Sequence, residues 1–231
     1  MSATKRGVFV ALALIAAMVF VRLGFWQLHR RQERLARNAL VTSRYGATAV
    51  DVASVPRDTA SARFMRARVA GTLDYDHEIV YAVRSYKGSP GVNLLTPVKL
   101  PGSDTAVIVD RGWVYSPDGS TIDKSKWHDR DSVFVGYVDE FPAGQGSSYI
   151  GKPTIIARLS YDAVSKALPY PVRRIYVVAM GDSANAQDRI ARLSIPPLDE
   201  GPHLGYAFQW FCFATIAVVG AGVVVVRGRD G

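Results

Sequence analysis

The sequence predicts an α+β protein in which two transmembrane helices flank an antiparallel, β-rich extramembrane domain. Two observations lead to this fold class. Each end of the 231-residue chain carries a long, almost uninterrupted apolar stretch, and stretches of this length are typical of membrane spans. Between them, short segments rich in β-branched and aromatic residues alternate with turn-forming residues, which is typical of a sheet.

The first apolar stretch covers residues 7–23 and reads GVFVALALIAAMVFVRL, with Arg22 as its only charged residue. An arginine near the end of a span can extend its charge to the lipid headgroups. A cleaved signal peptide is the alternative, but it requires small residues after the apolar core, and MVFVRLGFW is bulky. We therefore expect an uncleaved transmembrane helix over residues 7–26, after a cytoplasmic segment of residues 1–6. The helix should continue through the polar stretch QLHRRQERLARNAL, residues 27–40.

Residues 27–202 form the predicted extracytoplasmic domain, which is long enough to bury a hydrophobic core. Gly, Pro, Asp and Ser separate its strand-like segments, as turns require. One short helix is expected after Ser160, a good N-cap residue, and it should stop near Pro169. The predicted strands cover residues 64–73, 78–86, 91–100, 105–114, 133–141 and 173–181.

The second apolar stretch covers residues 206–226 and contains no charged residue. Tyr206 and Trp210 lie at its start, where aromatic side chains are common at the membrane interface. We expect a transmembrane helix over residues 203–226 and a cytoplasmic C-terminus over residues 227–231. Small residues in this helix either let another helix approach closely or simply reflect the composition of membrane helices; they are Ala217, Gly220, Ala221 and Gly222.

Two spans place both termini on one side of the membrane, but the charges do not fix which side. Basic residues after the second span favour a cytoplasmic C-terminus, whereas those after the first span favour a cytoplasmic loop. The residues concerned are Lys5, Arg6, Arg227 and Arg229 near the chain ends, and Arg30, Arg31, Arg34 and Arg37 after the first span.

The composition excludes several kinds of site. Cys212 is the only cysteine, so the chain can form no internal disulfide and no cysteine-based zinc site. The four histidines are scattered and form no metalloprotease motif. The net charge of +8 suits anionic partners such as membrane lipid. No nucleic-acid partner is expected, because the sequence carries none of the signatures of nucleic-acid-binding modules.

Few residues in the domain suggest catalysis. Asp74 and Asp76 flank a tyrosine next to His77, and a polar turn between two strands explains them. Ser147 and Ser148 lie in a glycine-rich segment without a nearby base. The motifs of nucleotide-binding and serine-hydrolase sites are missing from the sequence. We therefore do not expect an enzyme.

The stretch IVDRGWV is the other candidate for chemistry. Asp110 and Arg111 fit an ion pair at a strand end better than a catalytic pair. Gly112 would allow a bend there, and Trp113 would pack in the core. These residues are therefore expected to support structure.

Three parts of the sequence, taken in order, resemble one family. LGFWQLHRRQER (23–34) lies at the exit of the first span, and HLGYAFQWF (203–211) lies at the entry of the second. Between them, PGVNLLTPVKL (90–100) precedes VIVDRGWV (107–114). Their order and their positions relative to the spans resemble the Surfeit locus protein 1 family, the cytochrome c oxidase assembly factors. The resemblance covers nearly the whole chain.

The resemblance implies a membrane-anchored assembly factor of a haem–copper oxidase. It implies that the protein binds haem a and assists its insertion into subunit I, with haem a synthase as a further candidate partner. It also implies a multi-pass protein of the cell inner membrane with its domain in the periplasm. The short N-terminus, without an Arg- and Ser-rich transit peptide, favours a bacterial membrane over a mitochondrial one.

The family's haem-linked histidine matches His203, which is therefore the expected metal ligand. On a helix, His203, Tyr206, Ala207 and Trp210 share one face. A neutral imidazole is a normal axial ligand of haem iron. The aromatic side chains could cover the macrocycle, and the small Ala207 would leave room for it. The alternative is that His203 starts an interfacial helix and binds nothing.

Basic residues beyond the first span complete the expected site. Arg30, Arg34 and Arg37 repeat at helical spacing where haem propionates or lipid phosphates would lie. Anchoring to headgroups is the favoured role for these arginines. Trp26 and Gln27, in the same motif, are expected to support structure rather than chemistry.

Two other functions remain open at the level of sequence. The first is a structural chaperone that holds oxidase subunits together without binding haem. The second is a membrane-tethered periplasmic enzyme, which would require a nucleophile and base that the sequence does not reveal.

Overall fold

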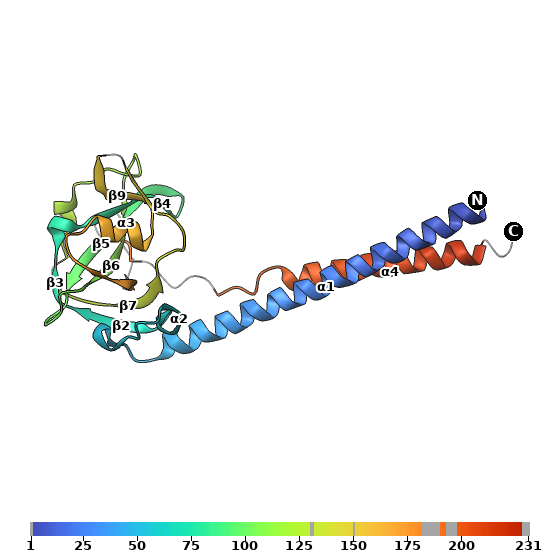
Figure 1. Cartoon of the computed structure of the whole chain (residues 1–231), viewed down its shortest axis with the longest axis horizontal. Coiled ribbons are helices and arrows are strands. Elements are labelled where there is room, and N and C mark those ends of the chain that lie inside the picture. Colours follow the sequence, from blue (N-terminus) through green and yellow to red (C-terminus); the bar gives the residue numbers. More distant parts are fainter. Residues whose placement is uncertain (1, 130–131, 150, 182–189, 193–197, 228–231) are drawn as a thin grey trace. The chain divides into compact units, whose positions relative to one another are not determined.

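The computed structural model describes residues 2–129, 132–149, 151–181, 190–192 and 198–227 (Figure 1). The chain divides into two compact units. One unit holds the two terminal segments, Met1–Thr42 and Pro197–Gly231, and the other holds Ser43–Pro196. The first is helical and the second is built on a sheet, which confirms the predicted α+β class. Arg229, one of the basic residues that bear on the predicted topology, lies outside the described residues.

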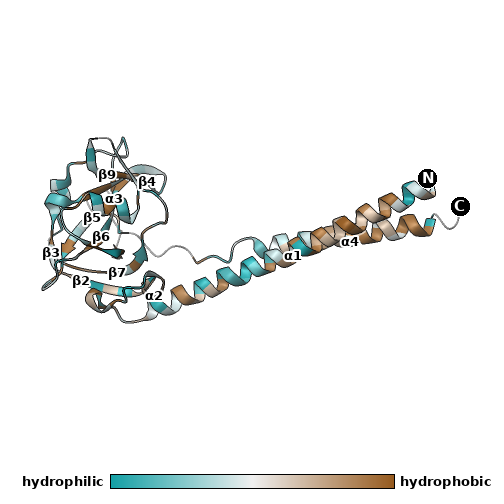
Figure 2. Cartoon of the chain, viewed as in Figure 1, coloured by the Kyte–Doolittle hydropathy of each residue, from teal (hydrophilic) through white to brown (hydrophobic). Residues whose placement is uncertain are grey.

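Two long helices make up the terminal unit: α1 covers Ala3–Gly46 and α4 covers His203–Arg227. Both are long and apolar enough to cross a membrane. In the most apolar stretch of each helix only 11% of the residues are buried, so most side chains there face outward. Figure 2 shows apolar residues along α4 and the first half of α1, and hydrophilic residues along much of the second half of α1. This distribution fits a membrane-anchored protein.

Helix α1 is much longer than a membrane span requires. Its 44 residues extend about 66 Å, whereas the hydrocarbon core of a bilayer is roughly 30 Å thick. No glycine or proline interrupts residues 25–45, and Glu33 pairs with both His29 and Arg30 on the helix surface. The polar stretch after the first span therefore continues the helix, as the sequence predicts.

Small residues line the contact between the two helices. Ala207, Ala214 and Ala221 of α4 are buried and lie seven residues apart, which is the repeat of antiparallel helices that pack along a seam. On α1, Gly24 is buried against the Phe211 ring, and a Cβ at this position would come within 2.6 Å of that ring. Close helix approach thus explains part of the small-residue pattern.

The remaining small residues of α4 behave differently. Ala217 is half-buried, and a Cβ at Gly220 or Gly222 would meet no described atom within 4 Å. Next to the seam, Phe20 of α1 stacks on Trp210 at 5.7 Å between ring centroids and meets Phe213 at 5.8 Å. Aromatic contacts therefore reinforce the seam toward the start of α4.

The second unit contains a sheet of ten strands among the described residues. Along the sheet the order is β1-β2-β7-β10-β6-β5-β4-β9-β8, and β3 pairs with β5. The strands are β1 (Val50–Asp51), β2 (Arg66–Ala70), β3 (Thr72–Leu73), β4 (Ile79–Tyr86), β5 (Ser89–Lys99), β6 (Ala106–Tyr115), β7 (Val133–Glu140), β8 (Ser147–Tyr149), β9 (Lys152–Arg158) and β10 (Val172–Ala179).

The sheet is mixed, so the prediction of an antiparallel domain was wrong in part. β10 runs parallel to β6, β9 parallel to β4, and β1 parallel to β2. Parallel neighbours are joined by long connections rather than tight turns. The chain passes through three other strands between β6 and β10. Alternation of apolar residues reveals a strand but not its neighbour, so the sequence could not show this pairing.

All six predicted strand segments form strands, with small shifts at their ends. The segment 64–73 divides into β2 and β3 at Gly71, where a Cβ would come within 2.3 Å of the Lys99 carbonyl oxygen. The sequence missed β1, β8 and β9, two of which are only two or three residues long.

Short helices connect the strands. They are η1 (Val52–Ser54), α2 (Thr59–Ala62), η2 (Tyr75–His77), η3 (Lys124–Trp127) and α3 (Tyr161–Lys166). Helix α3 is the one that the sequence predicts, and Ser160 caps it by accepting a 3.1 Å hydrogen bond from the Ala163 amide. It ends before Pro169, as expected.

The described residues of this unit include two clusters of buried apolar side chains. The larger lies under β2, β6, β7 and β10 and includes Val69, Val107, Val138, Ile175 and Val177. The smaller joins β4, β5 and β6 and includes Val80, Val92, Leu94 and Val114. The β-branched residues that predicted the strands are therefore also the core.

Arg111 is fully buried and is held by acidic groups from elsewhere in the chain. Its guanidinium pairs with the buried Glu78, with Asp129 at 2.8 Å, and with the Thr96 hydroxyl at 2.6 Å. The predicted ion pair between Asp110 and Arg111 was therefore wrong. The register of β6 against β5 shifts here, so that Leu94 pairs with residue 112 and Leu95 with residue 110. Arg111 is the extra residue of a β-bulge.

Gly112 follows the bulge and has a φ of +119°. Residues with a Cβ rarely adopt this backbone conformation, whereas glycine adopts it readily. A Cβ at this position would also come within 2.4 Å of the Ala191 carbonyl oxygen. The next residue, Trp113, is buried and exchanges backbone hydrogen bonds with Ala191. The bend and the packed tryptophan that the sequence predicts are both present.

Asp110 is buried away from Arg111. Its carboxylate accepts hydrogen bonds from the Asn93 amide group at 2.9 Å and from the Gly112 backbone at 3.0 Å. Burial raises the pKa of Asp110 to about 6, although both hydrogen bonds act in the opposite direction.

Replacing Gly112 by valine should greatly reduce the amount of folded protein. The side chain meets a backbone oxygen and a disfavoured φ, and together they should cost more than about 3 kcal/mol. Gly88→Val is the matched control, because Gly88 also has a positive φ, +83°, but open space for a Cβ. Thermal unfolding in detergent compares the two. Normal accumulation of the Gly112→Val protein with loss of function alone would instead place Gly112 in a functional surface.

Replacing Asp110 by asparagine should change how stability depends on pH. The folded-state pKa of this acid lies above its unfolded value near 4, so the folded protein binds the extra proton. Wild-type stability should therefore fall as pH rises from about 4 to 6, by on the order of 3 kcal/mol from this group. Asp110→Asn should flatten this part of the profile. Denaturant unfolding at pH 4, 5 and 7 measures it, and identical profiles would contradict the expectation.

Candidate functional site

The predicted metal ligand, His203, is the first residue of α4. Gly201, two residues earlier, has a φ of +67°, which turns the chain into the helix. A Cβ at this glycine would come within 2.6 Å of Arg34 Nη1 and 3.2 Å of His203 Cδ2. The turn thus brings the backbone close to both side chains, and its positive φ favours glycine there.

Gln27 of α1 holds the His203 ring from one side. His203 Nδ1 lies 2.8 Å from Gln27 Oε1, and the imidazole is half-buried. A carboxamide oxygen only accepts hydrogen bonds, so this contact requires the Nδ1–H tautomer of a neutral imidazole, in which Nε2 keeps its lone pair. Among the described residues, none is recorded as a hydrogen-bond partner of Nε2.

Gln27, which the sequence predicts to support structure, thus contacts the predicted ligand directly. Its neighbour Trp26 is 52% exposed, so burial in the helix pair does not explain that side chain. Gln27 is seven residues from Phe20, which touches Trp210, and this spacing places both on the same face of α1. A polar residue on the seam face was the available signal.

Arginines of α1 bind the acidic segment just before α4. Arg34 Nη1 lies 2.8 Å from Asp199 Oδ1, and Arg31 Nη2 lies 2.6 Å from Glu200 Oε2. Asn38 adds a 2.9 Å hydrogen bond to the Asp199 carbonyl oxygen. These contacts fix the chain that leads into His203, and the sequence analysis named neither acidic residue.

The expected basic residues therefore have protein partners in this structure. Arg30 forms an ion pair with Glu33 within α1, and among the described residues it forms no ion pair with the segment before α4. The ion pairs of Arg30 and Arg34 are exposed, and exposed pairs contribute about 1 kcal/mol or less. Both arginines could exchange these partners for an anionic ligand at small cost.

The aromatic residues of the expected site lie in different environments. Trp210 is half-buried against Phe20, whereas Tyr206 is 47% exposed. Ala207 is only 1% exposed, so protein atoms occupy the space beside it and it leaves no room for a ligand. The predicted common face is thus divided: part of it belongs to the helix seam and Tyr206 remains accessible.

Asp74 and its neighbours form a polar turn between β3 and β4, as the sequence predicts. Asp74 caps η2 by accepting from the His77 amide at 3.3 Å. Its carboxylate also forms an ion pair with Lys99 Nζ at 2.7 Å and accepts a hydrogen bond from the Tyr170 hydroxyl at 2.8 Å. Burial opposes ionisation, but these hydrogen bonds outweigh it and hold the pKa of Asp74 far below its usual value. No trio of metal-binding side chains occurs in the described part of the chain.

Comparison with known proteins agrees with these features. The family model described as "SURF1 family" matches residues 14–215. A SURF1-like protein of Rickettsia bellii is 28% identical over 214 residues, which cover 89% of this chain and 86% of that protein. A SURF1-like protein of Rickettsia felis is 27% identical over 89% of this chain and 92% of that protein. An uncharacterized SURF1-like protein of Mycobacterium bovis is 24% identical over 92% of this chain and 82% of its own length. The match of the family model extends from within the first apolar helix into the second, and the chain belongs to the SURF1 family.

Proposed function

We propose that this protein is an assembly factor for cytochrome c oxidase that binds haem a through His203 and assists its insertion into subunit I. The observation that carries the proposal is the orientation of one imidazole. Gln27 holds Nδ1 of His203, and Nε2 is left as the potential metal-binding atom. The three sequence stretches that resemble the oxidase assembly factors, together with family membership, supply the biological context.

The residues present suit a haem with a single protein ligand. Histidines that bind metals usually donate their second ring N–H to an oxygen acceptor, which fixes the ring and its tautomer. Gln27 provides that acceptor for His203 at 2.8 Å. A bound haem supplies an iron that an imidazole nitrogen can coordinate. The role of this chain is then to hold and release the group rather than to transform it.

Anionic and apolar parts of haem a would find different partners in the same unit. Arg30 and Arg34 are candidates for its propionates, because each already holds a carboxylate in an exposed ion pair. Tyr206 offers an accessible aromatic surface close to His203 in the helix. Trp210 would act indirectly, by packing on Phe20 and fixing the start of α4.

The setting that we propose is the cell inner membrane, with both termini in the cytoplasm and the domain in the periplasm. The two apolar helices support membrane anchoring. The proposed partners are oxidase subunit I, haem a synthase and the surrounding lipid. A structural chaperone that binds no haem is the competing function, and haem occupancy distinguishes the two.

Substitution of His203 tests the proposal directly. His203→Ala removes the proposed ligand but little buried area, so the protein should insert and accumulate normally. Co-purified haem per protein should fall by about tenfold or more, since a coordinate bond is lost. His29→Ala is the matched control, because His29 is an exposed histidine of the same unit. Absorption spectra and haem extraction from cells that make haem a provide the measurement.

The same experiment defines the part played by Gln27. Gln27→Leu should lower haem content less than His203→Ala does. Gln27→Glu should keep haem content near that of the wild type, because glutamate also offers an acceptor oxygen to His203 Nδ1. Equal haem content in wild type and His203→Ala would reject His203 as the ligand. No haem in any preparation would favour the structural chaperone.

The topology can be tested with reporters fused to the chain. A fluorescent protein that folds only in the cytoplasm should be bright after residue 231. An export-dependent phosphatase should be inactive there, but active when fused to a chain truncated after Gly46, which ends α1. The reverse pattern would place the domain in the cytoplasm and exclude the proposed periplasmic setting.

A further inference from the structure

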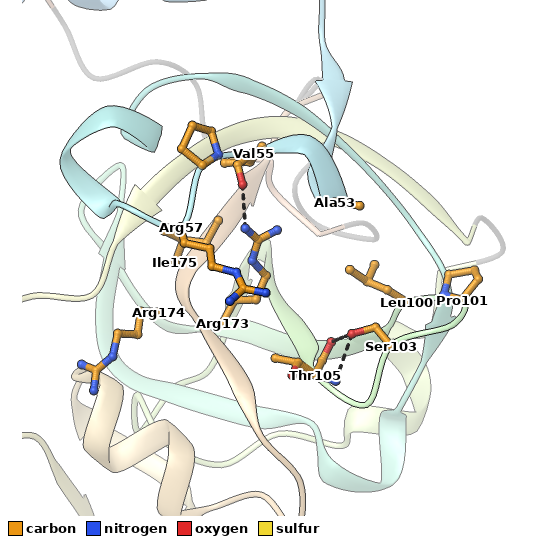
Figure 3. A pocket seen from close by; sticks show the side chains of 11 residues that line it. Ala53, Val55, Arg57, Leu100, Pro101, Ser103, Thr105, Arg173, Arg174 and Ile175 are labelled. Carbon is orange, nitrogen blue, oxygen red and sulfur yellow. Dashed lines mark hydrogen bonds between the residues drawn. The ribbon is translucent and has the colours of Figure 1, made fainter.

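A cavity of about 490 Å³ opens in the Ser43–Pro196 unit, outside the helix pair (Figure 3). Three separate segments surround it: residues 53–57 after β1, residues 100–105 between β5 and β6, and residues 173–175 at the start of β10. β10 lies parallel to β6 with Val172 opposite Ala106, and this pairing brings the second and third segments together. The cavity therefore depends on the mixed sheet.

Two arginines place their charged groups in this cavity. Figure 3 shows the guanidinium groups of Arg57 and Arg173 next to each other in its middle. Arg173 is fixed by hydrogen bonds to the carbonyl oxygens of Val52 at 2.5 Å and Val55 at 2.7 Å. Burial lowers the pKa of Arg173, and the positive charge of Arg57 lowers it further. Like charges have thus been brought together.

Among the described residues, none of those that line the cavity is acidic, although the exposed Asp104 lies between the lining residues Ser103 and Thr105. The neighbouring Asp51 and Asp58 are engaged elsewhere, since they accept hydrogen bonds from the Ala53 and Ser61 amides at 2.8 and 2.9 Å. Within the described residues, no ion pair is recorded for Arg57, Arg173 or Arg174. The charge of the cavity is therefore not neutralised by the lining residues.

Arg174 is the contrasting case on the same strand. Its side chain points away from the other two in Figure 3, and its guanidinium lies over the Tyr161 ring at 4.3 Å from the centroid. It carries the same charge at the same end of β10 but has a structural partner. This difference makes it a matched control.

The rest of the lining contributes an apolar wall and hydroxyl groups. Val55, Leu100, Pro101 and Ile175 form the apolar part. Ser103 and Thr105 lie on the opposite side from Val55 in Figure 3, and Ser103 is held by bonds to the Thr105 backbone.

We propose that this cavity binds a phosphate group, with Arg57 and Arg173 as its main ligands. Two adjacent guanidinium groups match a doubly charged tetrahedral anion, because each can present paired N–H donors to its oxygens. A single carboxylate would neutralise only one of them. Either a free phosphate compound or the headgroup of a phospholipid supplies this chemistry.

The test is phosphate binding by the full-length protein in detergent, measured by calorimetry with inorganic phosphate at constant ionic strength. Arg57→Gln should weaken binding by about tenfold or more, since one charge-assisted contact is lost. Arg174→Gln should change it less than about twofold. Arg173→Lys should also weaken binding while it retains the charge, because lysine cannot replace the planar fork.

The outcomes separate the sources and the rival ligands. A lipid headgroup is identified as the ligand if short-chain phosphatidic acid binds the wild type more tightly than inorganic phosphate does. The Arg57→Gln protein should then bind the two ligands with similar affinity. Equal affinities would identify a free phosphate compound. Absence of phosphate binding, equal binding by Arg57→Gln, or stronger binding of succinate than of phosphate would overturn the proposal. His203→Ala should bind phosphate normally, so this result is independent of the haem proposal.

Discussion

The buried charge of Arg111 is the constraint on which the sheet unit depends. Burial alone would lower the pKa of its guanidinium, but Glu78 and Asp129 outweigh that effect and raise it. The unit must therefore bring both carboxylates to one point in the interior. Glu78 precedes β4, Asp129 follows η3, and Arg192 also binds Asp129 at 2.7 Å. The β-bulge at Arg111 and the positive φ of Gly112 turn the backbone so that this network closes.

The helix pair follows different physics, because its apolar surface gains little by leaving a lipid environment. Close approach at Ala207, Ala214 and Gly24 then supplies van der Waals contact. Beyond the aromatic contacts of Phe20, the seam becomes polar, with Gln27 on His203 and arginines on Asp199 and Glu200. His203 lies where the two kinds of packing meet. Its imidazole is half-buried, and one ring nitrogen is engaged by Gln27.

The sequence by itself determined much of this protein. The length and polarity of residues 7–23 and 206–226 dictated two apolar helices, because only continuous helices satisfy every backbone polar group in lipid. Alternating β-branched residues predicted six strand segments, because the same residues must form the core, but they did not reveal the seven-residue β9. Ser160 and Gly112 were recognised from local chemistry, since a cap or a bend is specified by its immediate neighbours. Family resemblance gave His203 its expected role.

Tertiary structure alone decided which residues meet. The parallel pairing of β10 with β6 and the partners of Arg111 depend on segments far apart in the chain, and no local pattern encodes them. For the same reason the sequence did not show that Gln27 contacts His203, paired Asp110 with Arg111, and gave no sign that Arg57 lies near Arg173. Periodicity reports which face of an element is buried, whereas a binding site requires knowing what faces it. Ala207 illustrates the difference, because its small side chain admits a neighbouring helix rather than a ligand.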